Sequence, residues 1–345
     1  MNKRQFDITK TSDIKTLMML TVVFYHSICL WSTEGWHGTA VIASPFLAYC
    51  AKWFNGYMVQ TFTFVSAYIY SYLRNNGKYS DNKKYIKSRA ERLLIPYCVF
   101  VCIWAIPFYI ISDGGSFVGV IKHYFLGVQP DQLWFLLMLF LLSTLFCLIY
   151  RRIEHWNPII VLIILCAIYP IGLLGQSKGL NYFQICASIR YLVYFYFGLV
   201  YEKKELKCVK RVPALAWFVI YTGISLLKFF VLSKTSSTLV YLFSVAITPI
   251  VSLSGIMMSI SIISKFDFQA LKPGAMRIYD ILKKYSFTIY LLHMQIIVVM
   301  NGLLNGKCSV PIHVVCNFVI SMSISLLISI AMSKIRLFRT MLSIR

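Results

Sequence analysis

Charged side chains are scarce in this sequence of 345 residues, and acidic ones are the scarcest. Asp, Glu, Lys and Arg make up 13% of the chain, about half of the ~25% usual for a soluble domain. Only 12 residues are acidic, whereas 59% are hydrophobic and the mean hydropathy is +0.70. A water-soluble fold of this size cannot hide so much apolar surface, so the composition excludes an ordinary soluble protein and predicts a membrane protein.

The sequence also lacks cysteine pairs, internal repeats and long polar segments. Its ten Cys are scattered along apolar stretches and form no CxxC pair, which favours packing over metal binding, and we expect no metal. All connections between apolar runs are short. We therefore expect one integral membrane domain over residues 1–345, without a separate soluble domain.

Apolar runs of membrane-crossing length predict an all-α polytopic membrane protein with about ten transmembrane helices. A helix of about 20 apolar residues crosses the ~30 Å hydrocarbon core of a bilayer. The predicted spans cover residues 14–31, 45–73, 93–112, 132–150, 158–175, 185–201, 213–232, 239–263, 285–304 and 312–333.

The placement of the basic residues distinguishes between two partners. A net charge of +22 would suit a nucleic acid. However, 27 of the 34 Lys and Arg lie in one alternating set of connecting segments and 5 in the other, with Arg190 and Lys228 inside spans. This asymmetry follows the positive-inside rule, so we expect both termini in the cytoplasm, a lipid bilayer as the surroundings and no nucleic acid partner.

One histidine lies deep inside the first predicted span. His26 is about 12 residues from the start of that span, or roughly 18 Å, slightly beyond mid-membrane. Lys15 precedes it by 11 residues, and eleven steps of ~100° bring both side chains to nearly the same helix face. Because an ionisable group in hydrocarbon is costly unless it is paired or lines a polar cavity, His26 is a candidate functional residue.

A second deep histidine, His293, ends a stripe of polar groups. Ser286, Tyr290 and His293 follow i, i+4, i+7 spacing and share a helix face. His293 is about 8 residues or ~12 Å from the cytoplasmic end of its span, so the two histidines reach comparable depth from the same side. An interhelical hydrogen bond, a bis-histidine haem site and general base catalysis stay open. The last suits the unperturbed histidine pKa of about 6.5.

Two arginines stand at the cytoplasmic mouth of the third predicted span. Arg89 and Arg92 share a face if this segment is helical. Two guanidinium groups three residues apart can hold a phosphate or pyrophosphate through paired hydrogen bonds. Basic residues are also expected here for topology alone, so the segment does not decide between these interpretations.

Aromatic residues near the ends of spans are candidates for sugar contact. Trp134 and Phe135 open the fourth span, and the outer loop after the first span carries Glu34 and Trp36. Aromatic faces suit pyranose rings, but a belt of interfacial aromatic residues is the alternative. For the remaining histidines near span ends we expect solvated side chains: His123, His155 and His313.

Six segments, taken in order, resemble the acyltransferase 3 family of integral membrane enzymes over most of the chain. The resemblance is carried by Asp13, Lys15 and His26; by Thr63–Tyr68; by Arg89 and Arg92 leading into Leu93, Pro96 and Tyr97; by Leu133–Leu136; by Arg190 and Tyr191 with Phe195, Phe197 and Gly198; and by Ser286 through His293. Three departures stand out: Lys15 where arginine is common, Ala67 for glycine, and Gln132 for His or Tyr. Glycine permits closer backbone approach, so Ala67 is expected to stiffen or widen its helix contact.

This resemblance implies transfer of an acyl group, usually acetyl, from cytoplasmic acyl-CoA to a sugar hydroxyl. The implied acceptor is a cell-surface polysaccharide such as O-antigen, or its undecaprenyl-linked precursor, and the implied place is the inner membrane of a bacterial cell. His26 would take the hydroxyl proton or accept the acyl group, with His293, Tyr290 and Ser286 assisting. Lys15, Arg89 and Arg92 would hold acetyl-CoA, and Trp134, Phe135, Glu34 and Trp36 would contact the sugar. The competing function is a transporter or flippase of a lipid-linked glycan.

Overall fold

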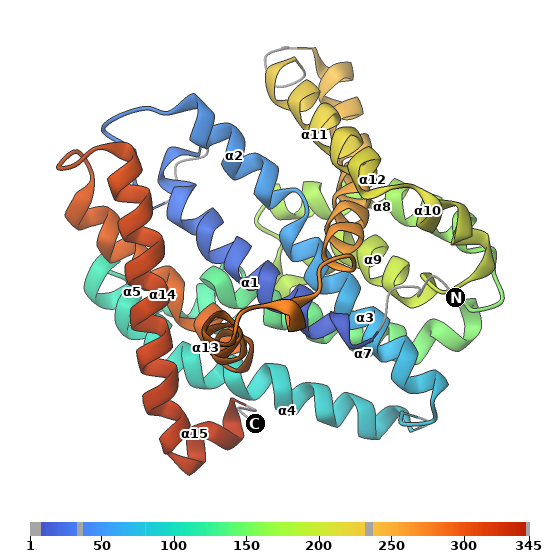
Figure 1. The fold of residues 1–345 in the computed structure, drawn as a ribbon, viewed down its shortest axis with the longest axis horizontal. Coiled ribbons are helices and arrows are strands. Elements are labelled where there is room, and N and C mark those ends of the chain that lie inside the picture. Colours follow the sequence, from blue (N-terminus) through green and yellow to red (C-terminus); the bar gives the residue numbers. More distant parts are fainter. Residues whose placement is uncertain (1–7, 33–36, 80, 232–236, 343–345) are drawn as a thin grey trace. The chain divides into compact units, whose positions relative to one another are not determined.

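The computed structural model describes residues 8–32, 37–79, 81–231 and 237–342. The chain is 83% helical, and no strand occurs in these residues, so it is an all-α polytopic membrane protein (Figure 1). Local sequence sets several helix starts. The Asp81 side chain accepts a hydrogen bond from the Lys83 amide at the start of α4. Asn157, just before α8, accepts one from the Ile159 amide, and α8 itself opens with Pro158.

Eight helical segments of the described chain are long and apolar enough to cross a membrane, judged by length and composition. They are Lys10–Trp31, Asn82–Ser112, Asp131–Ile153, Pro158–Ser177, Tyr182–Val200, Thr238–Ile263, Pro273–Leu304 and Val310–Lys334. Each overlaps one predicted span, although Asn82–Ser112 and Pro273–Leu304 begin more than ten residues earlier than predicted.

The other two predicted spans differ from expectation. The expected single span over 45–73 is wrong in form, because the chain turns at Gly56 between α2 (Pro45–Asn55) and α3 (Met58–Asn75). Asparagine and glycine at the junction are poor helix formers. α11 (Ala214–Phe230) is apolar but has only 17 residues. The 27-to-5 distribution of Lys and Arg is obtained by counting both regions as crossings, so ten crossings stay a prediction.

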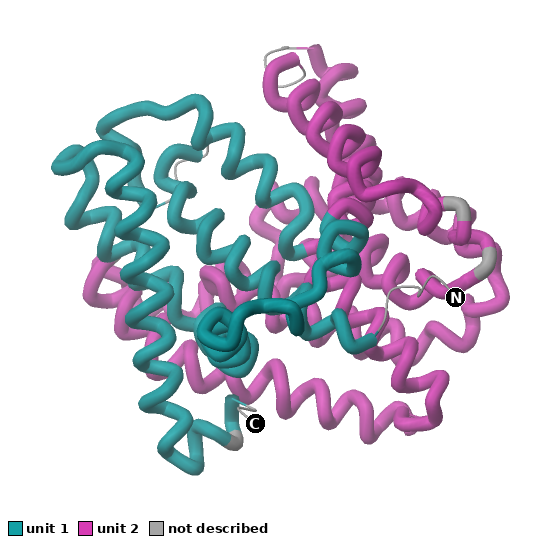
Figure 2. Tube along the Cα trace, in the orientation of Figure 1, with its two compact units in different colours: residues 1–59, 259–345 teal, residues 60–258 magenta. Residues whose placement is uncertain are grey.

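The chain divides into two compact units, one of residues 1–59 with 259–345 and the other of residues 60–258 (Figure 2). The single domain expected from the sequence stays a prediction. Unit 1 thus joins segments from the two ends of the chain. It contains α1 (Lys10–Ile28), α2, α13 (Pro273–Leu304), α14 (Val310–Lys334) and α15 (Arg336–Met341), with short 3-10 turns at Cys29–Trp31 and Phe268–Ala270.

Unit 1 is organised around α1, which packs against α13, α14 and α2, while α13 also packs against α14. The buried face of α14 is polar at every fourth residue. The side chains concerned are His313, Asn317, Ser321, Ser325 and Ser329. Because lipid supplies no hydrophobic drive for helix association, small and polar residues are the expected contacts between membrane helices.

Unit 2 holds the helices from the middle of the chain. They are most of α3, then α4 (Asn82–Phe100), α5 (Ile106–Asp113), α6 (Phe117–Val120), α7 (Trp134–Ile153), α8 (Pro158–Ser177), α9 (Ile185–Val200), α10 (Lys207–Arg211), α11 and most of α12 (Thr238–Ile263). A π-helical turn, Val101–Ala105, joins α4 to α5.

The centre of unit 2 is α9, which packs against α7 and α8. Aromatic rings fill this core, and the ring centroids of Phe146 and Phe195 are 5.2 Å apart. At Gly198 a Cβ atom would lie 2.3 Å from the Phe64 carbonyl oxygen and 2.9 Å from the Ala67 Cβ. The glycine that permits close approach to α3 therefore stands on α9, opposite Ala67.

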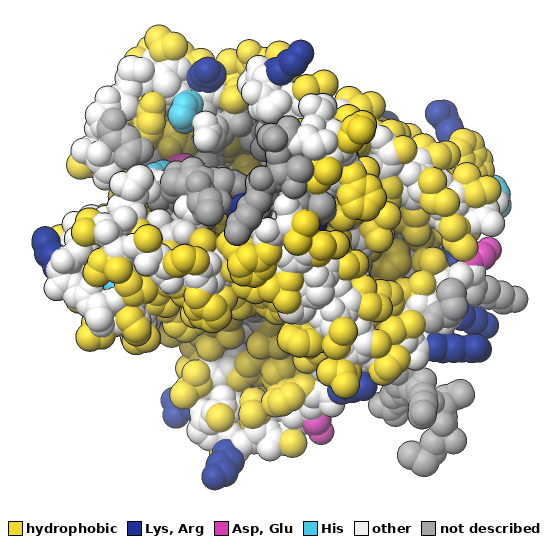
Figure 3. Space-filling model, turned by 90° about the horizontal axis from the view of Figure 1, so that it is seen from above, with side chains coloured by type: hydrophobic (Ala, Val, Ile, Leu, Met, Phe, Trp, Pro, Cys, Tyr) yellow, Lys and Arg dark blue, Asp and Glu magenta, His cyan; other side chains and the backbone are white. Residues whose placement is uncertain are grey.

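Large apolar side chains cover the outside of the helices. Ile111, Phe117 and Leu239 are each more than 70% exposed. Hydrophobic side chains dominate the face drawn in Figure 3, where Lys and Arg form isolated groups. Such a surface is stable only in contact with lipid.

Candidate active site

The two deep histidines meet in unit 1. His26 Nδ1 on α1 lies 2.7 Å from His293 Nε2 on α13, which is hydrogen-bond distance, and the rings are nearly parallel with centroids 5.0 Å apart. His293 is fully buried, whereas His26 keeps part of its side chain exposed. The structure therefore realises the matched depth predicted from helix rise, with the imidazole of His26 the more accessible.

A backbone carbonyl fixes which nitrogen carries each proton. His293 Nδ1 lies 3.2 Å from the carbonyl oxygen of Ile289, and a carbonyl oxygen only accepts, so Nδ1 is the protonated nitrogen. In neutral His293, Nε2 then bears the lone pair and accepts from His26 Nδ1–H. It follows that neutral His26 keeps its own lone pair on Nε2, the nitrogen that points away from His293.

This pairing also bears on the haem alternative. Two nitrogens on opposite sides of one metal ion are about 4 Å apart, because each metal–nitrogen bond is about 2 Å long. The 2.7 Å separation is a hydrogen bond and leaves no space for an ion between the two nitrogens. Among the residues that the structure describes, no three His, Cys, Asp or Glu gather to form a metal site.

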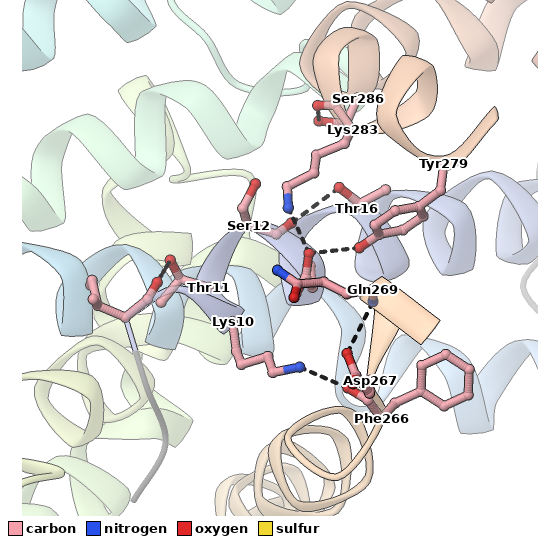
Figure 4. Close-up of polar contacts among 12 residues, drawn as sticks. Lys10, Thr11, Ser12, Thr16, Phe266, Asp267, Gln269, Tyr279, Lys283 and Ser286 are labelled. Atoms are coloured by element: carbon pink, nitrogen blue, oxygen red, sulfur yellow. Dashed lines mark hydrogen bonds and ion pairs between the residues drawn. The ribbon is translucent and has the colours of Figure 1, made fainter. Parts of the chain in front are cut away.

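A second polar contact joins α1 to α13 nearer their first residues. The Asp13 carboxylate, with only 10% of its side chain exposed, accepts hydrogen bonds at Oδ1 from Lys283 Nζ (2.7 Å) and from the Tyr279 hydroxyl (2.8 Å). Lys283 and Tyr279 both point from α13 toward α1 (Figure 4). The Tyr279 ring stacks on Phe268 with centroids 4.8 Å apart. A buried carboxylate needs such partners to remain ionised.

The remaining predicted residues of unit 1 lie near this pair of helices. The Tyr290 ring lies 5.9 Å from the His293 ring, and both residues are on α13. Ser286 donates its hydroxyl hydrogen bond to the Lys283 carbonyl oxygen within the same helix. Lys15 is half-buried on α1, two residues beyond Asp13. Tyr290 is thus beside His293, and the Ser286 hydroxyl is bonded to the backbone of its own helix.

The predicted phosphate-binding arginines belong to unit 2, on α4. Arg89 donates from Nε to the Tyr85 hydroxyl at 2.9 Å, and its Nη2 lies 3.5 Å from the Ser66 carbonyl oxygen on α3. Its guanidinium also lies over the Tyr85 ring, 5.2 Å from the centroid. Arg92 is exposed one turn further along. Arg89 is therefore oriented by two neutral groups, the Tyr85 hydroxyl and the Ser66 carbonyl.

The predicted sugar-contacting aromatics are half-buried in unit 2. The Trp134 ring meets Tyr191 edge to face at 5.5 Å, and Phe135 meets Phe62 at 5.9 Å. Their contacts connect α7 to α9 and α3. Glu34 and Trp36 lie outside the described residues.

Comparison with known protein families settles the class of enzyme. A model of the acyltransferase 3 domain matches residues 13–334, nearly the whole chain. The chain belongs to the acyltransferase 3 family. It is thus a multi-pass membrane acyltransferase. No curated protein matches it significantly, and no solved structure does so either.

Sequence reasoning missed one polar cluster of this acyltransferase. The prediction of a solvated side chain is wrong for His313. Its side chain is buried, with the residue only 2% exposed, and its Nε2 is hydrogen-bonded to Asn301 Oδ1 at 3.1 Å. Asn317 donates to the same Asn301 oxygen (2.8 Å) and to the Ser27 carbonyl oxygen (3.1 Å). The sequence signal that could have revealed this burial is the polar residue at every fourth position from His313 onward, which marks one face of the helix. The exposed His155 fits the expectation, and His123 is half-buried against the Tyr109 ring.

The Asp13–Lys283 contact was also missed. Charged residues at the ends of membrane spans are common, so Lys283 does not stand out in the sequence, and Asp13 is notable only as part of a family motif. A carboxylate and an ammonium group at the same level of two helices became evident only once α1 and α13 were packed together.

Proposed function

We propose that this acyltransferase moves an acetyl group from cytoplasmic acetyl-CoA to a sugar hydroxyl of a bacterial surface glycan, working in the inner membrane. The observation that carries the proposal is the His26–His293 hydrogen bond, which leaves a lone pair on His26 Nε2. A positioned imidazole whose Nε2 carries the lone pair suits removal of a hydroxyl proton near neutral pH.

The proposed step balances without a metal or redox partner. The sugar hydroxyl gives its proton to His26 Nε2 as its oxygen attacks the thioester carbonyl carbon. The C–S bond then breaks, the proton passes from His26 to the leaving thiolate, and the products are the sugar ester and free CoA. During the step His26 is an imidazolium that donates from Nδ1 to His293 Nε2, so the neutral partner stabilises the charge.

Arg89 and Arg92 are the proposed sites for the phosphates of the donor. They lie one turn apart on α4, in the segment with the densest basic charge, and Arg89 is oriented by Tyr85 and Ser66. Guanidinium groups bind phosphate oxygens through paired, charge-assisted hydrogen bonds. Lys15 is proposed as a further cation for the donor, and Trp134 and Phe135 as aromatic contacts for the sugar.

Family membership favours acyl transfer over the competing flippase. A flippase moves its glycan without consuming acyl-CoA. The imidazole pair also has no evident use in passive movement of a neutral sugar chain, whereas acyl transfer needs a base.

The test uses NMR of surface glycans from cells that lack the protein and are complemented with one of three forms at matched membrane levels. These forms are the wild type, His26→Ala and His155→Ala. His155 is a suitable control because its side chain is 83% exposed and lies outside the candidate site.

We expect acetyl signals with the wild type and with His155→Ala, and none with His26→Ala. Equal signals with His26→Ala would remove His26 from the reaction. If cells lacking the protein lost glycan export, and the wild type restored export without producing an acetyl signal, the flippase would be favoured. Incubation of purified enzyme with labelled acetyl-CoA alone, followed by a search for label on the protein, tests whether His26 carries the acyl group.

A further inference from the structure

Two polar contacts fix α1 against α13 in unit 1. One is the His26–His293 bond, and the other is the group of Asp13, Lys283 and Tyr279 (Figure 4). Asp13 precedes His26 by about 20 Å of helix, and Lys283 precedes His293 by about 15 Å. Since both contacts link the same two helices in the same chain order, α1 and α13 run in parallel.

We propose that Lys283 is a positioning residue: by binding Asp13 it fixes the axial register of α1 on α13 and so holds His26 Nδ1 against His293 Nε2. This inference rests on the proposed function for its catalytic readout. It assigns Lys283 no contact with substrate.

The hydrogen bond between the two histidines tolerates little displacement of one helix along the other. A nitrogen–nitrogen hydrogen bond is lost within a few tenths of an ångström, whereas a slip of one helix turn displaces a side chain by about 5.4 Å. Apolar packing in lipid is a weak guide to register, because hydrocarbon solvates apolar side chains as well as a neighbouring helix does. A buried charge pair resists the slip, because any slip leaves the Asp13 carboxylate buried without its cation.

The arrangement around Asp13 supports a register contact rather than a mobile surface ion pair. Both donors reach the same oxygen, and they come from positions one turn apart on α13. The Tyr279 ring is fixed in turn by Phe268, over which Lys10 of α1 also lies at 5.7 Å. Lys10 Nζ donates to the Phe266 carbonyl oxygen at 2.7 Å, which ties the start of α1 to the segment preceding α13.

A charge exchange tests the proposal. The variants are Lys283→Asp, Asp13→Lys and the double variant that restores the pair in reverse, each purified in nanodiscs. We expect each single variant to lose about 10- to 100-fold in kcat, as for misplacement of a reacting group by about an ångström. The KM for acetyl-CoA should change by less than about threefold, and the double variant should recover to within about fivefold of the wild type.

The matched control is Lys284→Asp, which makes the same change one residue away. Lys284 is exposed and lies over the Tyr285 ring at 5.6 Å, so its replacement should leave kcat and KM near the wild-type values. An increase in KM alone in Lys283→Asp, without rescue by the double variant, would overturn the positioning role in favour of donor binding. Wild-type kcat in Lys283→Asp would also overturn it.

A spectroscopic readout separates this inference from the proposed function. In protein labelled with ¹⁵N-histidine, the tautomer of His26 is read from its two ring nitrogens and assigned by loss of the signal in His26→Ala. We expect the Nδ1–H form in the wild type, in Lys284→Asp and in the double variant, and the Nε2–H form in Lys283→Asp. Tyr279→Phe, which loses one hydroxyl and keeps the ion pair, should retain the wild-type tautomer.

The two failures are then distinct. A Lys283→Asp protein that keeps the Nδ1–H tautomer would overturn the positioning role whatever the enzyme acylates. A tautomer change as expected, in a wild type that transfers no acetyl group to glycan, would leave the register contact standing and overturn the proposed function.

Discussion

Two tightly packed helix pairs of this protein are held together in different ways. In unit 2, α8 and α9 meet through small residues: a Cβ at Gly172 would lie 2.6 Å from the Cys186 carbonyl oxygen. In unit 1, α1 and α13 meet through bonded polar side chains, His26 with His293 and Asp13 with Lys283. The first contact depends on backbone shape, and the second depends on functional groups that one substitution can remove.

This difference predicts that substitutions in the two pairs will separate stability from activity. Filling a glycine contact forces helices apart and lowers the stability of the fold. Changing an imidazole of the α1–α13 contact is expected to remove the proposed base catalysis while the apolar packing around it persists. The α8–α9 pair also has a polar contact, in which the Arg190 guanidinium donates to Tyr169 and Gln176 on α8.

The largest expected effect is on turnover in His26→Ala. Loss of a general base costs about 10²- to 10⁴-fold, so we expect kcat to fall by about 10³-fold. The measurement is acceptor-dependent release of free CoA by purified enzyme, with thermal unfolding followed in parallel. A fall in activity matched by an equal loss of folded protein would contradict the separation of the two kinds of contact.

Next in size is the effect of replacing the partner of His26. His293→Gln keeps an oxygen that accepts from His26 Nδ1–H, whereas His293→Leu removes the acceptor. We expect about a 10-fold loss of kcat for Gln and about a 100-fold loss for Leu, because the base is misoriented in the second case. Equal losses in the two variants would show that the hydrogen bond does not orient His26.

A smaller effect, on stability, is expected for Gly172→Val in the α8–α9 pair. The new side chain would overlap the Cys186 carbonyl oxygen, and overpacking of this kind costs about 1–3 kcal/mol. Thermal unfolding in detergent is the measurement, and kcat per folded molecule should stay near that of the wild type. Gly223→Val on α11 is the control, since no atom lies within 4 Å of its Cβ position.

The smallest expected effect is on donor affinity in Tyr85→Phe. This change removes the hydroxyl that accepts from Arg89 Nε, so the guanidinium is less well oriented. One such hydrogen bond is worth about 1 kcal/mol, and we expect the KM for acetyl-CoA to rise about fivefold with kcat unchanged. Lys84→Gln, an exposed change on the same helix, serves as control. A larger rise in that control would point to overall basic charge instead of Arg89.

Much of the fold could be predicted because apolar runs and helix rise are local properties. The depths of His26 and His293 followed from counting residues along two spans, and the structure joins these two residues. The break between α2 and α3 escaped prediction because residues 45–73 are continuously apolar enough to read as one span. The turn at Gly56 interrupts them.

The side chains that support the site were harder to predict than the histidines. Lys283 resembles an ordinary charged residue at a span end, Asp13 is notable only as a motif residue, and only tertiary packing places the two in contact. His313 lies near a span end, where solvent is the default expectation, and its burial depends on Asn301 from another helix. Both cases require knowledge of which helices are neighbours, and a single sequence does not contain it in a local pattern.

The sequence separation between the two histidines has a consequence for biogenesis. His293 is 267 residues from His26, so a ribosome has synthesised most of the chain before the second imidazole reaches the membrane. Until α13 inserts, His26 and Asp13 on α1 lack their partners His293 and Lys283. The buried polar face of α14 is added later still. With His26 and His293 in the roles proposed, we expect a nascent or prematurely terminated chain to be inactive, so that the order of synthesis delays acyl transfer until insertion is nearly complete.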